Sequence, residues 1–253
     1  MNFFIDTEFL EGKQPTIFNR NPKPVIDLIS IGIISNDNRS YCAISKDFNI
    51  REAWNRYDLV ESYPADKYEG RFKVRNYWIR NNILLPIFIE LCEKSGKAHD
   101  YDTNKFKFTY RNFKRLIKEY GKSNKQIAHE VKGFIYSHYI EPCYNDLDEA
   151  IEQNNKINPI QFYGYYADYD WVVFCWLFGR MIDLPKCFPM YCIDLKQMLD
   201  AKVDDLYDEK GINRKLLLDG LKDRPDYPKQ YNEHNALSDA KWNKRFYEFI
   251  NKI

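Results

Sequence analysis

The stretch Phe3–Phe9 constrains the fold most, because it places two acids in an otherwise apolar, strand-like run. Side chains alternate between the two faces of a strand, so Asp6 and Glu8 share one face with Phe4. Two like charges about 4 Å apart repel by roughly 4 kcal/mol at an effective dielectric constant of about 20. A fold tolerates such a pair if water solvates both acids or if a cation lies between them. The stretch alone is compatible with either arrangement.

The next two apolar runs predict partners for this strand. Residues 25–34 are apolar on both faces, as is typical of a central strand that is covered on both sides. Residues 35–38 predict a tight turn and residues 41–44 a further strand, whereas residues 11–24 have the Gly, Pro and Asn content of a loop. The first 45 residues are therefore expected to form an antiparallel meander of three strands, with the Asp6/Glu8 strand inside the sheet.

The segment that follows the meander predicts helices, and part of it is basic. Residues 50–92 are expected to be mostly helical, because apolar pairs recur at helical spacing until Pro86 interrupts them. Residues 105–125 hold eight basic residues and one acid, interleaved with aromatic rings. This pattern suits a nucleic-acid surface, with cations for phosphates and rings for bases. It also suits an amphipathic helix with lysines on its hydrated face, an interpretation favoured for the helix itself. The apolar stripe of that helix would consist of Phe113, Leu116, Ile117 and Tyr120.

A third apolar strand, residues 160–166, leads directly into two acids and a helix. Asp168 could act as the N-cap of that helix, which we expect to end at Gly179. Asp170 would then lie in the first helical turn and face the carboxyl end of the strand. Ligands bind at this end of the strands in open α/β sheets.

The C-terminal stretch brings a histidine and an aspartate near the start of an amphipathic helix. His234 and Asp239 are five residues apart, so on one helix they would point about 140° away from each other. They converge only if His234 precedes the helix and Asp239 lies within it. Asn235 is a suitable N-cap and would give that arrangement. Taken alone, such a pair more often consists of exposed surface residues without a functional role.

Composition limits the broad class of the protein. The 253 residues suffice for one large domain or a domain with an insertion, and the 38 basic and 37 acidic residues nearly cancel. Six cysteines without a C-x-x-C pair predict reduced thiols, and hence a cytoplasmic location. The longest apolar run, residues 171–178, is far shorter than the roughly 20 residues that span a bilayer. We therefore expect a soluble protein that does not bind membranes.

Taken together and in chain order, five of these residues resemble the motifs of the DEDD exonucleases in the ribonuclease H-like superfamily. The first motif, D-x-E, corresponds to Asp6-Thr7-Glu8, and the second to residues 164–170 with Asp170 at the end. The third is His234-x4-Asp239. A tyrosine-type member would carry tyrosine at position 235, which is asparagine here, so the histidine subtype (DEDDh) is indicated.

The chain is most similar to one branch, the bacterial ribonuclease AS-like 3′-5′ exoribonucleases. The resemblance covers residues 1 to about 90 and about 125 to 250, and it rests on the D-T-E-F opening and on residues 28–32, 78–80 and 236–240. Tyr166 departs from the small polar residue of many members, which affects the pocket and not the metal ligands. The resemblance implies an α/β fold with a ribonuclease H-like mixed five-stranded sheet. Three antiparallel strands and further parallel strands would be flanked by helices, in a single domain over residues 1–253 with a basic helical insertion at about 93–123.

The resemblance also implies a metal-dependent 3′-5′ exoribonuclease that releases nucleoside 5′-monophosphates from single-stranded RNA. Two divalent cations, Mg²⁺ or Mn²⁺, would be held by carboxylate oxygens. Asp6 would bridge both ions, Glu8 and Asp239 would complete the first site, and Asp170 would support the second, directly or through water. His234 would be the general base that takes a proton from the attacking water, a role suited to a side chain that titrates near neutral pH.

The substrate contacts are less specific. Phe9 and Leu10 follow the first motif and would wedge or stack on the terminal base, although a core role is an equal alternative. Lys114, Arg115 and Lys118 would contact phosphates of a longer strand. RNA is favoured over single-stranded DNA as the partner, and a homodimer is compatible with the resemblance. The alternatives are a 3′-5′ exodeoxyribonuclease, a non-catalytic nucleic-acid-binding domain on the same scaffold and an unrelated metal-dependent phosphoesterase.

Overall fold

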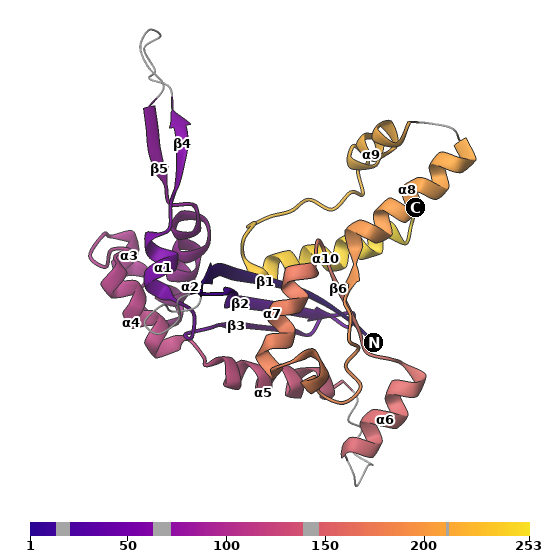
Figure 1. Ribbon diagram of the computed structural model, residues 1–253, viewed down its shortest axis with the longest axis horizontal. Coiled ribbons are helices and arrows are strands. Elements are labelled where there is room, and N and C mark those ends of the chain that lie inside the picture. The colour runs from indigo at the N-terminus through magenta and orange to yellow at the C-terminus, as the bar shows by residue number, and fades with distance from the viewer. Residues whose placement is uncertain (14–20, 63–71, 139–146, 211–212) are drawn as a thin grey trace. The chain divides into compact units, whose positions relative to one another are not determined.

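A computed structural model describes residues 1–13, 21–62, 72–138, 147–210 and 213–253 (Figure 1). These residues form two compact units. The first comprises residues 1–9, 28–43 and 122–253, and the second comprises residues 10–27 and 44–121. The strands β1 (Asn2–Lys13) and β2 (Pro24–Ser35) each contribute residues to both units.

The first unit is built on a mixed five-stranded sheet in the order β3-β2-β1-β6-β7. The added strands are β3 (Ser40–Ile44), β6 (Gln161–Gly164) and β7 (Ile193–Asp194). Ser35 at the end of β2 donates its backbone N–H to Arg39 O beside β3, and Asn36 N donates to Asn2 O at the start of β1, so these strands are antiparallel. The pairs β1–β6 and β6–β7 are parallel. The expected α/β fold with a mixed five-stranded sheet is confirmed.

The two faces of this sheet are covered by different helices. Phe4 stacks on its register partner Tyr163, and both rings contact Tyr247 of α10 (Ala236–Ile250). Phe3 points to the opposite face and contacts Phe134 of α5 (Asn124–Tyr136), while its register partner Phe162 contacts Trp171 and Phe174 of α7 (Asp168–Phe178). The alternation of side chains along β1 therefore decides which helix each residue of the first motif meets.

A glycine in β2 lets the start of α10 approach the sheet closely. A Cβ atom on Gly32 would lie 2.3 Å from the backbone carbonyl carbon of Ala236 and 2.4 Å from Leu237 N, far inside any allowed contact. Asn235 caps this end of the helix, because its side chain accepts a hydrogen bond from Ser238 N. The predicted N-cap is thus confirmed, and the first turn of α10 is fixed against the centre of the sheet.

The first unit has four further helical elements among the described residues. They are α6 (Leu147–Ile157), the short 3₁₀ helix η2 (Met181–Asp183), α8 (Leu195–Lys210) and α9 (Arg214–Lys222). The structure corrects the sequence prediction at the start of α7, because the N-cap is Ala167 and Asp168 lies in the first turn beside Asp170. Gly179 ends α7 with a positive φ of 116°, as expected. All five cysteines outside the undescribed segments are free thiols.

The second unit contains a β-hairpin where the sequence predicted helix. After α1 (Ile50–Asn55), the strands β4 (Asp58–Ser62) and β5 (Phe72–Asn76) pair antiparallel. Leu59, Val60 and Val74 of this hairpin are exposed, so the segment has no buried periodic face from which sequence reasoning could recognise it. The first strand of the sheet also extends to Lys13, which corrects the start of the predicted loop at residues 11–24.

The helical part of the second unit follows the hairpin. A π-helical turn, η1 (Arg80–Leu84), continues into α2 (Leu85–Lys94), and Pro86 lies in the first turn of α2 and does not interrupt the helix. Then come α3 (Ala98–Asp102) and α4 (Tyr110–Tyr120). Phe113, Leu116 and Ile117 of α4 are fully buried, which confirms the amphipathic helix, whereas Tyr120 was expected in the same stripe and is exposed. In the described part of the chain, no helix is long and apolar enough to cross a membrane.

Candidate metal centre

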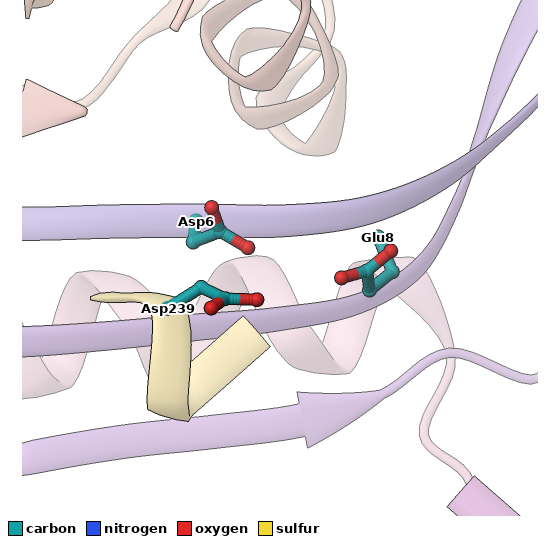
Figure 2. A group of neighbouring side chains, drawn as sticks. All are labelled: Asp6, Glu8 and Asp239. Carbon is teal, nitrogen blue, oxygen red and sulfur yellow. The ribbon is translucent and has the colours of Figure 1, made fainter. Parts of the chain in front are cut away.

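Three carboxylates from distant parts of the sequence meet beside β1. One oxygen from each of Asp6, Glu8 and Asp239 lies within 4.8 Å of one from each of the others, an arrangement that could hold a metal ion (Figure 2). Asp6 and Glu8 share the face of β1 on which Phe4 contacts α10, and Asp239 lies in the first turn of that helix. Strand alternation and the Asn235 cap thus explain why these three residues converge.

Asp170 reaches the same strand from its other face. The Oδ1 atom of Asp170 accepts hydrogen bonds from the backbone N–H of Thr7 at 2.8 Å and from the Thr7 hydroxyl at 2.6 Å. Thr7 points away from Asp6 and Glu8, toward the face covered by α7, because it lies between them in a strand. Asp170 is therefore fixed beside the cluster and is not one of the three residues whose oxygens converge.

The electrostatics show that these carboxyl groups resist ionisation together. Burial raises the pKa of Asp6 well above its usual range, and Asp170, Glu8 and Asp239 raise it further. Burial, followed by the charges of Asp239 and Asp170, raises the pKa of Glu8 to about 8. Burial also raises the pKa of Asp170 to about 6, against the opposing effect of the Thr7 hydrogen bonds. Clustered carboxylate oxygens are the donors that Mg²⁺ and Mn²⁺ prefer, and a cation would offset this repulsion, so the residues fit a divalent-metal site.

The raised pKa values predict how the stability of the metal-free protein depends on pH. Between about pH 4.5 and pH 8, the folded state binds more protons at Glu8 than the unfolded state does, so stability falls as pH rises through this window. The variant Glu8→Gln lacks this group. In EDTA, we expect its melting temperature to rise relative to that of the wild type as the pH is raised from 5 to 8. Adding Mn²⁺ at pH 8 should raise the melting temperature of the wild type more than that of the variant. A difference in melting temperature between the two proteins that does not change with pH would contradict the attribution of this pH dependence to Glu8.

His234 lies immediately before α10, as the spacing of the third motif predicts. Its backbone is in the left-handed region with φ of 66°, and its N–H donates to Asp239 Oδ2 at 2.8 Å. The residue is partly exposed. This arrangement places the histidine next to the cluster.

Sequence reasoning missed several residues that hold the centre in place. Gln230 Nε2 donates to Asp239 Oδ1 at 2.7 Å, Asn243 Nδ2 donates to Ile5 O at 2.8 Å, and Asp194 Oδ2 accepts from Ala167 N at 2.8 Å before α7. Strand alternation alone could have indicated that Thr7 points to the face opposite Asp6 and Glu8, but not that the helix bearing Asp170 covers that face. Gln230 lies in a segment without periodicity, so no signal in the sequence marked it.

The candidate substrate residues have different environments. The Phe9 ring is partly buried and lies 5.9 Å from the exposed Tyr169 ring, centroid to centroid. Leu10 is only 1% exposed, so its environment is that of a core residue. Lys114, Arg115 and Lys118 are exposed on α4 within the second unit. With Arg111 and Glu119 they line an open hollow of about 450 Å³.

The fold and the site together define an α/β protein with a carboxylate cluster suited to divalent cations at its central strand. Comparison with family models identifies residues 1–251 as a 3′-5′ exoribonuclease Rv2179c-like domain, and the chain therefore belongs to this family. The match supports a nuclease function, that of a 3′-5′ exonuclease hydrolase. No curated protein matches the chain.

Proposed function

We propose that the protein is a metal-dependent 3′-5′ exoribonuclease of the DEDDh type that releases nucleoside 5′-monophosphates from the 3′ ends of single-stranded RNA. The convergence of Asp6, Glu8 and Asp239 is the observation that carries the proposal. The two hydrogen bonds from Thr7 that hold Asp170 beside this cluster support the proposal. The family description, which names an exoribonuclease, favours RNA over DNA.

The carboxylates define the metal requirement that we propose. Asp6, Glu8 and Asp239 would hold one Mg²⁺ or Mn²⁺, and Asp6 with Asp170 would hold or support a second. Divalent cations supply polarisation of phosphate oxygens and activation of water for in-line displacement. Asp170 keeps one oxygen free of the Thr7 bonds, since both donors converge on Oδ1. Thr7 therefore orients the remaining oxygen of Asp170 without blocking it.

His234 is the general base in this proposal. The attacking water gives its proton to the imidazole as its oxygen bonds to the phosphorus of the terminal phosphodiester. The bond from phosphorus to the 3′-oxygen of the preceding nucleotide breaks, that oxygen keeps the electron pair and takes up a proton from solvent, and the terminal nucleoside 5′-monophosphate leaves. The hydrogen bond from His234 N to Asp239 Oδ2 joins the backbone of this residue to a proposed metal ligand.

Aromatic side chains next to the first motif are suited to the terminal base. Phe9 follows Glu8 directly and contacts Tyr169, one residue before Asp170. Stacking of a base on such rings contributes about 1–3 kcal/mol and tolerates any base. We assign Phe9 to this contact and Leu10, which is buried, to the core.

The basic face of α4 is proposed to bind phosphates of longer RNA strands. Replacing Lys114, Arg115 and Lys118 with glutamine should weaken the binding of strands several nucleotides long and reduce the slope of log K against log salt by about 2, since each phosphate contact on a single strand contributes about 0.7. Affinities of wild type and variant for a long oligomer over a series of salt concentrations measure this slope.

The control for this variant neutralises three cations that are already paired. Lys94, Lys196 and Arg224 each form an ion pair with a neighbouring acid, so their replacement gives the same net charge without removing the α4 face. If the α4 variant keeps the RNA affinity and the salt slope of the wild type, the basic face of α4 does not bind RNA and is only a hydrated helix surface.

The decisive test of the function follows the products of one oligomer labelled at either end. RNA labelled at the 5′ end should shorten in single-nucleotide steps with Mg²⁺ or Mn²⁺, whereas RNA labelled at the 3′ end should release labelled monophosphate immediately. EDTA should stop both reactions. A DNA oligomer of the same sequence, degraded faster than RNA, would reassign the protein as an exodeoxyribonuclease. The absence of metal-dependent cleavage of either substrate would overturn the proposal.

A further inference from the structure

The segment that precedes α10 is hydrogen-bonded to the middle of that helix. Trp242 Nε1 donates to Pro228 O at 3.0 Å, and Arg245 donates to Lys229 O at 3.3 Å. Further along, Asn235 N donates to Asn232 O at 3.2 Å and closes a turn. Residues 228–235, here called the strap, thus lie against α10 although they form no regular element.

The strap also supplies hydrogen bonds to both oxygens of a proposed metal ligand. Gln230 Nε2 donates to Asp239 Oδ1 at 2.7 Å, and His234 N donates to Asp239 Oδ2 at 2.8 Å. Two donors on different oxygens fix the plane of a carboxylate, and each oxygen retains capacity for a further bond. The side-chain bonds to Pro228 O and Lys229 O just before Gln230, and the turn closed by Asn235 N and Asn232 O after it, hold this residue near Asp239 although it is exposed.

We propose that Gln230 is a positioning residue of the metal centre. Its carboxamide orients the Asp239 carboxylate toward Asp6 and Glu8 and so raises the affinity of the site for a divalent cation. The inference rests on the proposed function, since it assumes that Asp239 binds metal. Groups that hydrogen-bond to metal ligands typically change metal affinity by about 10–100-fold when they are removed.

The experiment separates this role from packing. Gln230→Met keeps the approximate length and volume of the side chain and removes the donor, whereas Gln230→Ala removes both. A matched control is Gln126→Met, because Gln126 Nε2 makes an equivalent bond to Glu130 Oε1 at 2.9 Å on α5. Calorimetric titration of each full-length protein with Mn²⁺, without RNA, gives the affinity directly. Melting temperatures in EDTA report on the fold.

The expected result is a loss of Mn²⁺ affinity of about tenfold or more in both Gln230 variants and none in Gln126→Met. In EDTA, the melting temperature of Gln230→Met should be close to that of Gln126→Met. Turnover should recover at saturating Mn²⁺, because the defect is in the binding of the metal. Such a recovery would not follow from a damaged fold.

Two outcomes overturn the inference, and they are distinct from failure of the proposed function. Wild-type affinity in Gln230→Met, with a loss only in Gln230→Ala, would assign the residue to packing of the strap. If both Gln230 variants bind Mn²⁺ with wild-type affinity while Asp239→Asn loses affinity, the metal centre does not depend on Gln230. If the wild type itself fails to bind Mn²⁺, the proposed function fails and the inference fails with it.

Discussion

Asp6→Asn is expected to reduce turnover on RNA by at least about 10³-fold while the protein stays folded. Burial raises the pKa of Asp6, and the charges of Asp170, Glu8 and Asp239 all raise it further. The cations that it would share supply several kcal/mol of transition-state stabilisation, and each 1.36 kcal/mol corresponds to a factor of ten in rate. The amide removes one negative charge from a repulsive group, so the metal-free variant should be at least as stable as the wild type.

Three measurements on Asp6→Asn check this result: turnover at saturating Mg²⁺, affinity for Mn²⁺ and melting temperature in EDTA. Asp168→Asn is the matched control, because Asp168 is an exposed acid in the first turn of α7, close in sequence to Asp170. The control should retain activity. Full activity in Asp6→Asn would remove this residue from the metal centre, and a large loss of melting temperature would indicate that the loss of activity arises from the fold.

Much of the candidate site could be predicted because its geometry depends on local rules. Alternation along β1 places Asp6 and Glu8 on one face, and a side-chain cap at Asn235 starts α10 between His234 and Asp239. Asp170 follows from the transition between a strand and a helix. Each rule acts within about ten residues, so the sequence contains enough information to place each side chain on its own element. Which elements meet is not local, and the order of the motifs indicated it only through the family resemblance.

The features that escaped prediction depend on contacts distant in the sequence or on exposed surfaces. The hairpin of β4 and β5 exposes Leu59, Val60 and Val74, so it lacks the periodic burial that reveals a strand or helix. Gln230 became part of the site only through the path of the strap against α10. Gly32 gave no sign that a helix would approach it, because close approach is a property of the packed structure.

Replacement of His234 is expected to lower turnover by about 10²–10⁴-fold, the usual contribution of a general base. His234→Asn is the better variant for this test, since asparagine adopts positive φ more readily than alanine and φ is 66° here. The backbone N–H that donates to Asp239 is kept in either variant, so Mn²⁺ affinity should change little. Turnover measured against pH at saturating metal should lose the limb that reports the base, and added imidazole should restore part of the rate.

His129→Asn, at an exposed position on α5, should leave turnover unchanged. An unaltered pH profile in His234→Asn would mean that the attacking water loses its proton to another group, and the carboxylates would then carry the chemistry without a histidine base.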